Sequence, residues 1–432
     1  MPSQGGLIQL IAKGAQDVFL TGNPDVTFFK VVYRRHTNFS RESIEQSIVG
    51  TPSPGSTVSC EIGRFGDLIS GMYLEFETDL ENTSSTAQNT MTARSDILNT
   101  YFYRQAIEFV ELEIGGQKID KHYGRWLDMW YTLTQSGSDK SKNSLIGTSH
   151  GRPHYVPLMF WFNRNPGLSL PLISLQYHEV KVNIKFGTGS TTAAWSQPHN
   201  AEGNSNTRLL YKGMSKISTA KLWVDYIFLE TEERKAFAKL SHEYLIEQVQ
   251  YTGGFSVPQN TTSGFQFGAR LDFNHPVKEL IWVLEDSDGY PTYEHDDITI
   301  NFNGTERFEK RSSEFFTVIQ PYYHHTCNVS PAVQLGIHVY SFALRPEQHQ
   351  PSGAANFSRI DNVTLQIGKV NKNLASNTPP VTGAGVDSET VGWWQNNGRG
   401  DWQAGAGSLH IFAFSYNVLR VVSGMGALAY ST

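Results

Sequence analysis

The sequence predicts an all-β protein that contains two similar domains in tandem. Aromatic residues make up 12% of the chain and Gly occurs 38 times, whereas charged residues reach only 18%. This composition favours short strands joined by tight turns over long, surface-charged helices. Apolar residues recur at the two-residue period of strands, and the order of these stretches in the first half returns in the second. At 432 residues the chain also exceeds the length of one ordinary core.

One strand-turn-strand unit occurs twice and carries the evidence for duplication. In the first copy, an aromatic run at 155–162 leads through an Asn-Pro-Gly turn into an alternating strand at 180–184. In the second copy, an apolar run at 337–344 leads through a Gln-Pro-Ser-Gly turn into an alternating strand at 363–367. Strict alternation is typical of a strand with one wet face, whereas a continuous apolar run fits a strand buried on both faces.

The N-terminal segment, residues 1–26, is expected to form an arm. Its short apolar patch at 7–11 either docks on a neighbouring molecule or packs on its own domain. The run at 26–33 predicts a strand, and Arg34 and Arg35 follow it. Two adjacent arginines are more typical of a solvated edge or an ion-pair site than of a phosphate site.

Two strands and a hairpin are predicted next. Residues 58–78 read as two strands around a glycine-containing loop, and residues 107–120 form a hairpin with acidic residues on its wet face. Gly115 and Gly116 supply the positive φ angles that a tight hairpin turn needs.

A short helix is expected before the first strand-turn-strand unit, because Trp126, Met129 and Trp130 lie at helical spacing. A strand at 221–229 closes the first half. Tracts rich in small polar residues predict surface loops at 81–95, 134–152 and 187–206.

A change of pattern marks the boundary between the domains. Thr231 can cap a helix, and the two glutamates that follow it complement the positive helix end. We therefore predict a first domain at 27–230, a helical connector at 231–245 and a second domain at 246–432.

The second half repeats the order of the first. An alternating strand at 298–305 runs into an Asn-Gly turn, which places Gly304 as the counterpart of Gly116. The final strand at 409–422 corresponds to the strand at 221–229. Repeats of this length indicate a duplicated domain rather than a solenoid, whose units are much shorter.

Charge, cysteine content and targeting signals exclude several classes of protein. The net charge of −6 gives no general attraction to nucleic acid. The N-terminus lacks the basic start and apolar core of a secretory signal, and no window is long enough to span a bilayer. Cys60 and Cys327 could pair, but two buried free thiols are favoured. We expect a soluble protein made in the cytosol.

No catalytic, cofactor-binding or metal-ligating residue is predicted, and we expect no enzyme activity and no cofactor. The cluster from Glu294 to Asp297 and the pair His324-His325 lack the helix spacing and sulfur ligands of a dedicated metal site, so surface loops are the better interpretation. The acidic pair Glu232-Glu233 fits a solvated helix start. The chain has no Gly-x-Ser-x-Gly elbow and no Walker loop.

Asn-x-Ser/Thr triplets are frequent, but none is predicted to be glycosylated. Such triplets are common by chance in Asn- and Thr-rich loops, and a cytosolic chain does not meet the secretory glycosylation machinery. They begin at Asn38, Asn82, Asn260, Asn303, Asn328, Asn356 and Asn362.

Eight stretches spread over nearly the whole chain carry a family resemblance. They are 14–24, 28–35, 112–123, 168–181, 223–229, 242–248, 356–362 and 416–426. In these stretches the sequence resembles the major capsid proteins of nucleocytoplasmic large DNA viruses, in particular those of algal viruses such as the chlorella viruses. The stretches that match poorly, at 81–92, 187–211 and 371–407, read as surface loops in which such proteins differ.

The resemblance implies a double jelly roll, that is, two tandem eight-stranded jelly-roll β-sandwiches with a short helical connector. It also implies a homotrimer whose copies tile the icosahedral capsid of a large dsDNA virus, with minor capsid proteins beneath the shell and possible glycans on outer loops. Two similar rolls taken three times about an axis give a tile with six near-equivalent corners, which fits a hexagonal lattice. The expected location is the virion, after synthesis and assembly in the host cytoplasm.

Two other functions remain open at this point. The chain could be a less abundant double-jelly-roll minor capsid protein, which copy number in the virion would distinguish. It could also be a jelly-roll carbohydrate-binding protein or a glycosidase, since one fold serves many functions. A glycosidase needs paired acids in a cleft, and the sequence indicates no such pair.

Overall fold

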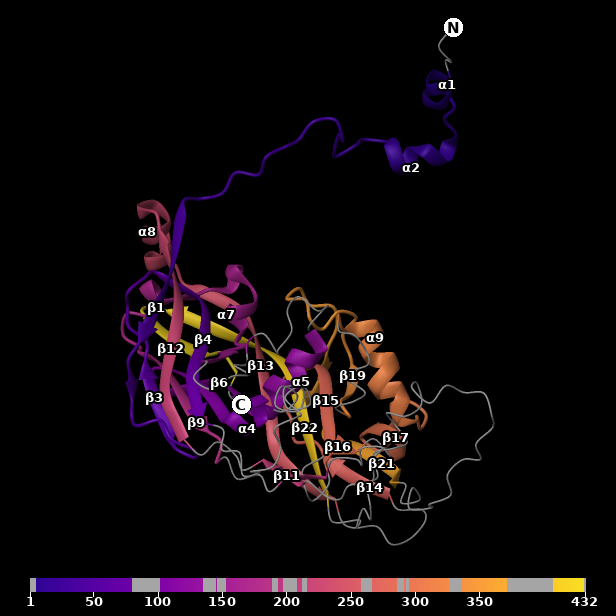
Figure 1. Ribbon diagram of the computed structural model, residues 1–432. Helices are drawn as coiled ribbons and strands as arrows, with labels where there is room; N and C mark the ends of the chain where they lie inside the picture. The colour runs from indigo at the N-terminus through magenta and orange to yellow at the C-terminus, as the bar shows by residue number, and fades with distance from the viewer. Residues whose placement is uncertain are drawn as a thin grey trace, which may run out of the picture. The chain divides into compact units, whose positions relative to one another are not determined.

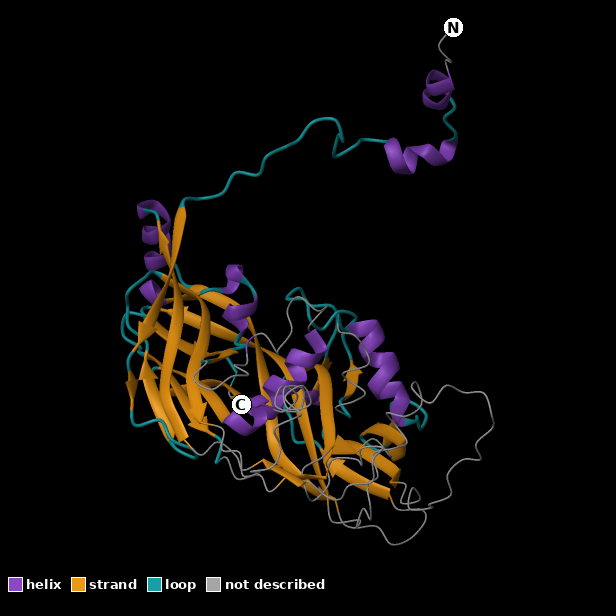
Figure 2. Ribbon diagram, in the orientation of Figure 1, coloured by secondary structure: helices purple, strands orange, loops and turns teal. Residues whose placement is uncertain are grey.

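The computed structural model describes residues 5–79, 102–134, 145, 153–188, 193–196, 208–211, 216–257, 266–285, 291–292, 295–326, 336–370 and 407–430. The chain divides into two compact units, Met1–Phe39 and Ser40–Thr432. The second unit holds the β-sheets of the described chain, and strands dominate it (Figure 2).

The described part of the first unit contains three short helices, namely α1 (Gly5–Ile11), η1 (Ala15–Asp17) and α2 (Val18–Thr21). The strand predicted at 26–33 is wrong, because this run has no regular secondary structure and its side chains are exposed. A strand needs a neighbour for its backbone N–H and C=O groups, and apolar β-formers alone do not provide one.

The first sandwich consists of two antiparallel sheets (Figure 1). One sheet has the order β1 (Phe39–Gln46), β12 (Lys216–Leu229), β4 (Leu68–Asp79) and β7 (His154–Pro157), with β8 (Leu170–Pro171) also on β4. The other has the order β2 (Ile48–Val49), β3 (Thr57–Glu61), β9 (Val180–Phe186), β5 (Ile107–Ile114) and β6 (Gln117–Tyr123). The strands β10 (Ala193–Ser196) and β11 (Arg208–Tyr211) pair with each other.

The second sandwich repeats this arrangement. One sheet has the order β13 (His242–Val257), β22 (Gly407–Val422), β15 (Pro276–Glu285) and β16 (Pro291–Thr292), with β19 (His338–Ser341) and β20 (Ala355–Asn356) on β15 and β23 (Met425–Leu428) on β22. The other has the order β14 (Gln266–Arg270), β21 (Val363–Val370), β17 (His295–Phe302) and β18 (Thr305–Glu306).

The two sandwiches share one strand order. The path β1-β12-β4-β7 corresponds to the path β13-β22-β15 with β19 on β15, and β3-β9-β5-β6 corresponds to β14-β21-β17-β18. Each strand holds the same place in the chain order of its half. The predicted duplication and the double jelly-roll fold are therefore confirmed.

Local chemistry repeats together with the topology. Gly115 and Gly116 turn the β5–β6 hairpin at φ angles of 59° and 81°, and Asn303 and Gly304 turn the β17–β18 hairpin at 50° and 84°. Both turns need left-handed backbone, which Gly and Asn tolerate best.

The two turns of the strand-turn-strand units also match. Asn165 caps η3 (Pro166–Leu168) by accepting from the Gly167 amide at 2.9 Å, and Asn356 caps η6 (Phe357–Arg359) by accepting from the Ser358 amide at 3.1 Å. The aromatic run before the first turn is only partly a strand, because residues from Trp161 onward form a short helix.

The remaining helices connect or cover the sheets. They are α4 (Phe102–Ala106), α5 (Gly124–Thr134), α7 (Trp161–Arg164), η4 (Leu172–Ser174), α8 (Thr231–Lys239), the π-helical η5 (Phe315–Ile319) and α9 (Gln320–His324). The helix predicted from Trp126 and Trp130 is α5, and the predicted connector helix is α8. The predicted cap at Thr231 is wrong, because Glu230 occupies the N-cap position and makes no side-chain capping bond.

In the described part of the chain, the helices are all too short or too polar to cross a bilayer.

Candidate functional site at the junction of the two sandwiches

The junction between the sandwiches begins with two strands that are buried on both faces, β15 and β22. On β22, Ile411 and Ala413 lie in the core of the second sandwich, whereas Phe412 and Phe414 face the opposite way. Those two rings belong to one apolar cluster with residues of the first sandwich. By contrast, β9 alternates strictly between buried and half-buried residues. The continuous apolar run in the sequence is thus the local cause of the second buried face.

Helix α5 of the first sandwich covers this face with two tryptophans. The ring centroids of Trp126 and Phe412 lie 5.8 Å apart, and those of Trp130 and Phe414 lie 4.7 Å apart. Trp126 and Trp130 stack on each other at 5.2 Å. Aromatic pairs at such distances contribute about 0.5–1.5 kcal/mol each beyond their buried area. The helix therefore makes an aromatic contact between the halves.

A first buried ion cluster joins Glu247, Lys278 and Arg164. The Lys278 side chain is 0% exposed, and its ammonium donates to Glu247. From the first sandwich, the Arg164 guanidinium donates to the other carboxylate oxygen of Glu247 at 2.6 Å. Both cations also lie over the Phe414 ring, at 4.5 Å for Lys278 and 4.8 Å for Arg164. Burial lowers the pKa of Lys278, and the Glu247 charge opposes that shift.

A second cluster centres on Glu285, which is buried at the end of β15. Arg104 donates to Oε1 of Glu285 at 2.7 Å, and Arg125 donates to Oε2 at 3.0 Å. Both arginines come from the first sandwich, so one carboxylate of the second sandwich holds two cations of the first. These charge-assisted hydrogen bonds both attract the two halves and define how one half is positioned against the other.

His410 and Tyr251 extend the Glu285 cluster. Burial, and next the charge of Arg125, lower the pKa of His410 to about 4. Burial raises the pKa of Tyr251 to about 12, so its hydroxyl stays protonated. The Tyr251 hydroxyl therefore donates to Nδ1 of a neutral His410 at 2.6 Å, which leaves Nε2–H toward Glu285 at 3.6 Å.

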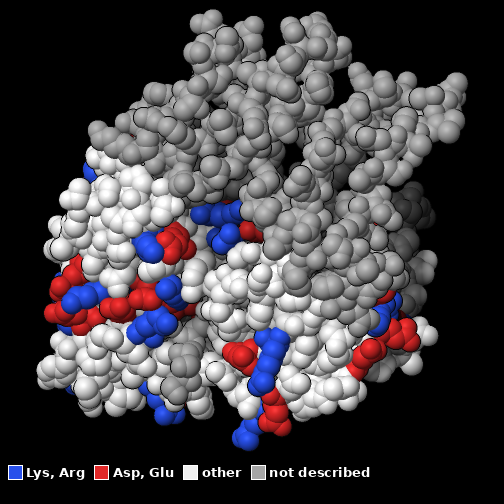
Figure 3. Space-filling model, turned by 90° about the horizontal axis from the view of Figure 1, so that it is seen from below, with Lys and Arg blue, Asp and Glu red and all other residues white. Residues whose placement is uncertain are grey.

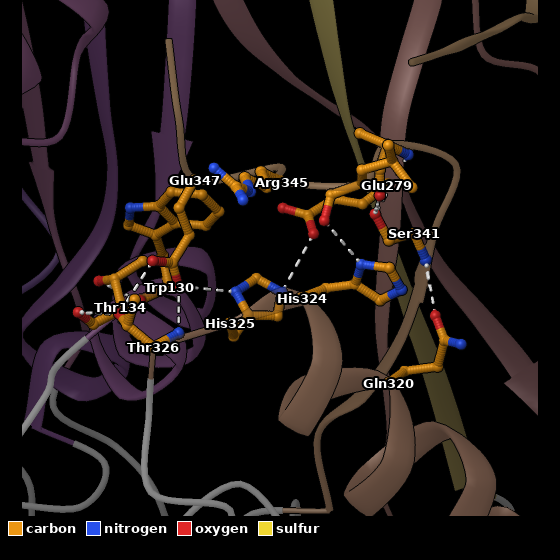
Figure 4. A network of polar contacts seen from close by, with 12 residues as sticks. Trp130, Thr134, Glu279, Gln320, His324, His325, Thr326, Ser341, Arg345 and Glu347 are labelled. Atoms are coloured by element: carbon orange, nitrogen blue, oxygen red, sulfur yellow. Dashed lines mark hydrogen bonds and ion pairs between the residues drawn. The ribbon is translucent and has the colours of Figure 1, made fainter. Parts of the chain in front are cut away.

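A third cluster surrounds His325 (Figure 4). Its Nε2 lies 3.1 Å from Glu279 and its Nδ1 lies 3.0 Å from Glu347, while the side chain itself is fully buried. Burial alone would lower the pKa of His325, but Glu279 and then Glu347 reverse the effect and raise the pKa to about 9. The imidazolium is thus a fixed cation between two carboxylates at neutral pH.

Thr326 and Trp130 connect this third cluster to the first sandwich. The Thr326 hydroxyl lies 2.8 Å from a Glu347 oxygen and 3.2 Å from the Thr134 carbonyl, and the Thr326 amide donates to Glu347 at 2.9 Å. The Trp130 ring meets the His325 ring edge-on at 6.3 Å. All three ion clusters therefore border on the apolar contact made by α5.

Backbone groups complete the junction. The Val249 amide donates to Oδ1 of Asp120 at 3.1 Å, and the Gln248 amide group donates to the Ile119 carbonyl. The Gly426 amide donates to Nδ1 of His178 at 3.2 Å. Each of these bonds links β-hairpin or loop residues of the first half to strands of the second half.

The structure corrects the interpretation of His324 and His325 as surface-loop residues. His325 is buried in the junction, and His324 is half-buried with its Nδ1 at 3.1 Å from the Leu344 carbonyl. The two nitrogens of the His325 ring lie next to carboxylates on opposite sides of the ring. The imidazole and the two carboxylates therefore do not converge on one metal position. Within the described ranges, no group of three acidic, His or Cys side chains could hold a metal.

Other residues singled out in the sequence do not take part in the contacts of the junction given above, or are not described. Glu294 and Cys327 fall outside the described residues, and Asp297 has left-handed backbone at φ 53°. Cys60 is a buried free thiol, as predicted, and burial raises its pKa to about 11. Glu232 is exposed on α8, as expected of a solvated helix start.

The described residues also include Arg34, Arg35 and four of the triplet asparagines, Asn38, Asn303, Asn356 and Asn362. Both arginines are exposed in the first unit. The Asn362 amide donates to Oδ1 of Asn303 at 2.9 Å, so these asparagines connect two loops of the second sandwich.

The described surface carries charges of both signs. Figure 3 shows acidic and basic side chains interleaved in bands rather than gathered by sign. On the outer face of β5 and β9, Lys185 pairs with Glu108 at 2.8 Å, and Asn183 donates to Glu113 at 2.9 Å. The lysine pair offsets part of the acidic charge that the sequence predicted for this hairpin, and the amide satisfies Glu113 by a hydrogen bond.

The ionic residues of the junction were not predicted from the sequence. Their partners lie more than one strand apart, and pattern analysis of single strands cannot match them. One signal was available, because Lys278 and Glu279 interrupt an otherwise apolar strand. Charges in such a position are rarely buried unless they are paired.

Comparison with known proteins gives two family matches that together span most of the chain. The family described as "Major capsid protein N-terminus" matches residues 27–230, and that described as "Large eukaryotic DNA virus major capsid protein" matches residues 233–427.

Individual relatives match over their full length. The major capsid protein of Pyramimonas orientalis virus is 43% identical, and that of Paramecium bursaria Chlorella virus 1 is 38% identical, each over 99% of both chains. A quasi-atomic structure of the PBCV-1 virus capsid contains a chain that is 34% identical, with a TM-score of 0.71 over 94% of this chain and 100% of that one. The protein therefore belongs to the major capsid proteins of large eukaryotic DNA viruses.

Proposed function

We propose that three copies of this chain associate into a pseudo-hexagonal capsomer, and that such capsomers tile the icosahedral shell. The chain is a structural capsid protein of the virion, and the trimer is the step beyond that assignment. The observation that carries it is the junction, which joins two sandwiches of one strand order within one compact block. Three such blocks around an axis present six similar sandwiches, as a hexagonal lattice requires.

The division of the chain follows from the same proposal. We assign the first jelly roll to 27–230, the connector to 231–245 and the second jelly roll to 246–432. The family matches at 27–230 and 233–427 support this division. The compact second unit begins at Ser40, so residues 27–39 are the part of the first segment that lies outside it.

Further partners are proposed beneath the shell. The first unit exposes apolar side chains from Leu7 to Tyr33, which supports a role in contacts with neighbouring capsomers or minor capsid proteins. We propose no enzymatic reaction for this chain. The relatives above are named as major capsid proteins. That naming favours the major capsid role over the minor one and over a carbohydrate-binding protein.

The test is the mass and outline of the purified protein. Light scattering is expected to give three times the 48.4 kDa chain mass, and electron microscopy is expected to show three-lobed particles with a pseudo-hexagonal base. A stable monomer at assembly concentrations contradicts the trimer. Quantitative mass spectrometry of virions checks the major role, because a minor protein would be present in far fewer copies than the shell lattice requires.

A further inference from the structure

Helix α9 of the second sandwich is the structural counterpart of α5 in the first. Helix α5 lies between β6 and β7, and η5 with α9 lies between the corresponding strands β18 and β19. In α5, Trp126 and Trp130 are four residues apart and are buried against the second sandwich. The corresponding helix has the same spacing in Ile319 and Tyr323, with Tyr322 between them.

The apolar face of this second helix is exposed. Tyr322 is 70% exposed and Tyr323 is 71% exposed, and their ring centroids lie 5.4 Å apart. Ile319 and Leu344 are also exposed, and the Leu344 carbonyl lies 3.1 Å from Nδ1 of His324, the next residue of the helix. The helix buries Phe316 and Gln320 on its own sandwich, so the exposed side chains are those that point away from it. Contiguous exposed apolar side chains on a soluble protein mark an interaction surface.

In the first sandwich, the β1-β12-β4-β7 sheet is the counterpart of the β13-β22-β15 sheet, whose outer face α5 covers. The outer face of the β1-β12-β4-β7 sheet carries a row of three half-buried aromatic rings, in which Tyr73 stacks on Trp223 at 6.2 Å and meets Tyr155 at 6.2 Å. These rings lie on β4, β12 and β7, which correspond in strand order to β15, β22 and β19 of the second sandwich. Of those strands, β22 carries the rings Phe412 and Phe414 that α5 contacts.

Charged pairs surround this aromatic row. Arg41 pairs with Asp225 at 2.6 Å and Lys221 with Glu45 at 3.4 Å, while the Trp223 indole donates to Glu75 at 2.7 Å. An aromatic centre with a polar rim is the usual composition of a protein–protein interface. The covered sheet of the second sandwich has the same plan, with Phe412 and Phe414 at its centre and the ion clusters around them.

We propose that the exposed helix face, made of Ile319, Tyr322, Tyr323 and Leu344, docks on the Tyr73–Tyr155–Trp223 face of a second copy of this chain. The contact repeats between chains the junction that α5 makes within one chain. The two surfaces lie toward opposite ends of the second unit, with β12 at the left and α9 at the right (Figure 1). A head-to-tail contact of this kind closes into a ring when the rotation between neighbouring chains matches the rotation between the two sandwiches of one chain. Three chains then form a ring of six sandwiches.

This interface rests on the proposed trimer and specifies which surfaces build it. Its test uses the full chain with Tyr322→Arg and Tyr323→Arg combined on the helix, and separately Trp223→Arg on the sheet. Each variant is expected to raise the dissociation constant of the trimer at least about 30-fold, as loss of an aromatic interface centre does. Tyr177→Arg is the matched control, because Tyr177 is 76% exposed and belongs to neither surface, and it is expected to leave the trimer intact.

Footprinting of the unmodified trimer gives a second measurement that does not depend on how the variants fold. The extent of hydroxyl-radical labelling is expected to be at least about fivefold lower at Tyr322 and Tyr323 than at Tyr177, because the first two tyrosines become buried on association. If the wild-type chain is a trimer in which both tyrosines label as strongly as Tyr177, this interface is wrong but the trimer is not. The same conclusion follows if both variants remain trimeric. A wild-type chain that stays monomeric contradicts the trimer and the interface together.

Discussion

Replacing Glu247 by Gln is expected to destabilise the fold by about 3–5 kcal/mol, the cost of removing one partner from a buried ion cluster. Glu247 is 4% exposed, and its carboxylate is the common partner of Lys278 and Arg164. With a neutral amide in its place, the two cations at the Phe414 ring lose the carboxylate that both of them contact. The fully buried Lys278 then carries most of the cost, because burial already disfavours its charged form.

The same strand supplies a matched control. Glu243 also lies on β13 and pairs with Arg420 of β22 at 2.9 Å, but the two side chains are 61% and 55% exposed. Exposed pairs contribute about 0–1 kcal/mol, so Glu243→Gln is expected to change stability by less than about 1 kcal/mol. The two variants remove one negative charge by the same atom replacement, but Glu247 is buried with two cation partners, whereas Glu243 is exposed with one.

Urea unfolding at one fixed protein concentration measures both variants, since association shifts apparent stability. The midpoint is expected to fall clearly for Glu247→Gln and hardly at all for Glu243→Gln. A triple variant with Glu247→Leu, Lys278→Met and Arg164→Met tests the cause, because apolar replacement of a whole buried cluster is often neutral or stabilising. Equal small losses for the two Glu→Gln variants would refute the assignment of Glu247 as the anchor of the junction.

Three further predictions concern the junction and the repeated hairpin. The pKa of His325 is raised from 6.5 to about 9, so the stability that its charge contributes is complete below about pH 6.5 and is lost as the pH rises through about 9. Urea unfolding at several pH values across that range should show this loss, and the pH dependence should be absent in His325→Gln. Phe414→Ala removes the ring that Trp130 and two cations contact, and urea unfolding is expected to show a loss of about 3–5 kcal/mol. Gly304→Ala places a side chain at φ 84° with open space around it, so unfolding should show only the backbone cost, about 1 kcal/mol.

Much of the fold follows from short-range patterns in the sequence. The alternation at 180–184 and 363–367 predicts β9 and β21, and the turns at Gly116 and Gly304 predict the two hairpins, because a strand face and a left-handed turn are local properties. The strand predicted at 26–33 fails for the complementary reason. Strand propensity does not create a pairing partner, and the first unit provides none among its described residues.

The candidate site depends on contacts that local patterns do not encode. Spacing indicates that Trp126 and Trp130 lie on one side of a helix, but it does not indicate that the second sandwich covers them. His325 looks like a loop residue because its two carboxylate partners lie on other segments, and only the folded topology places Glu279 and Glu347 around it. Charge partners on distant strands thus become visible only when the strand order is known.

The outer faces of β12 and β22 differ because they are covered at different stages. On β22, Phe412 and Phe414 meet α5 of the same chain, so folding alone removes both rings and the ion clusters around them from water. On β12, Trp223 is flanked by the charged residues Lys221 and Asp225, which pair with side chains of the neighbouring strand β1. A face that meets its partner only on assembly must stay soluble beforehand, and an aromatic centre within a charged rim satisfies both needs. Duplication therefore supplied two equivalent sheets, and the residues on their outer faces separate the contact made in folding from the contact proposed for assembly.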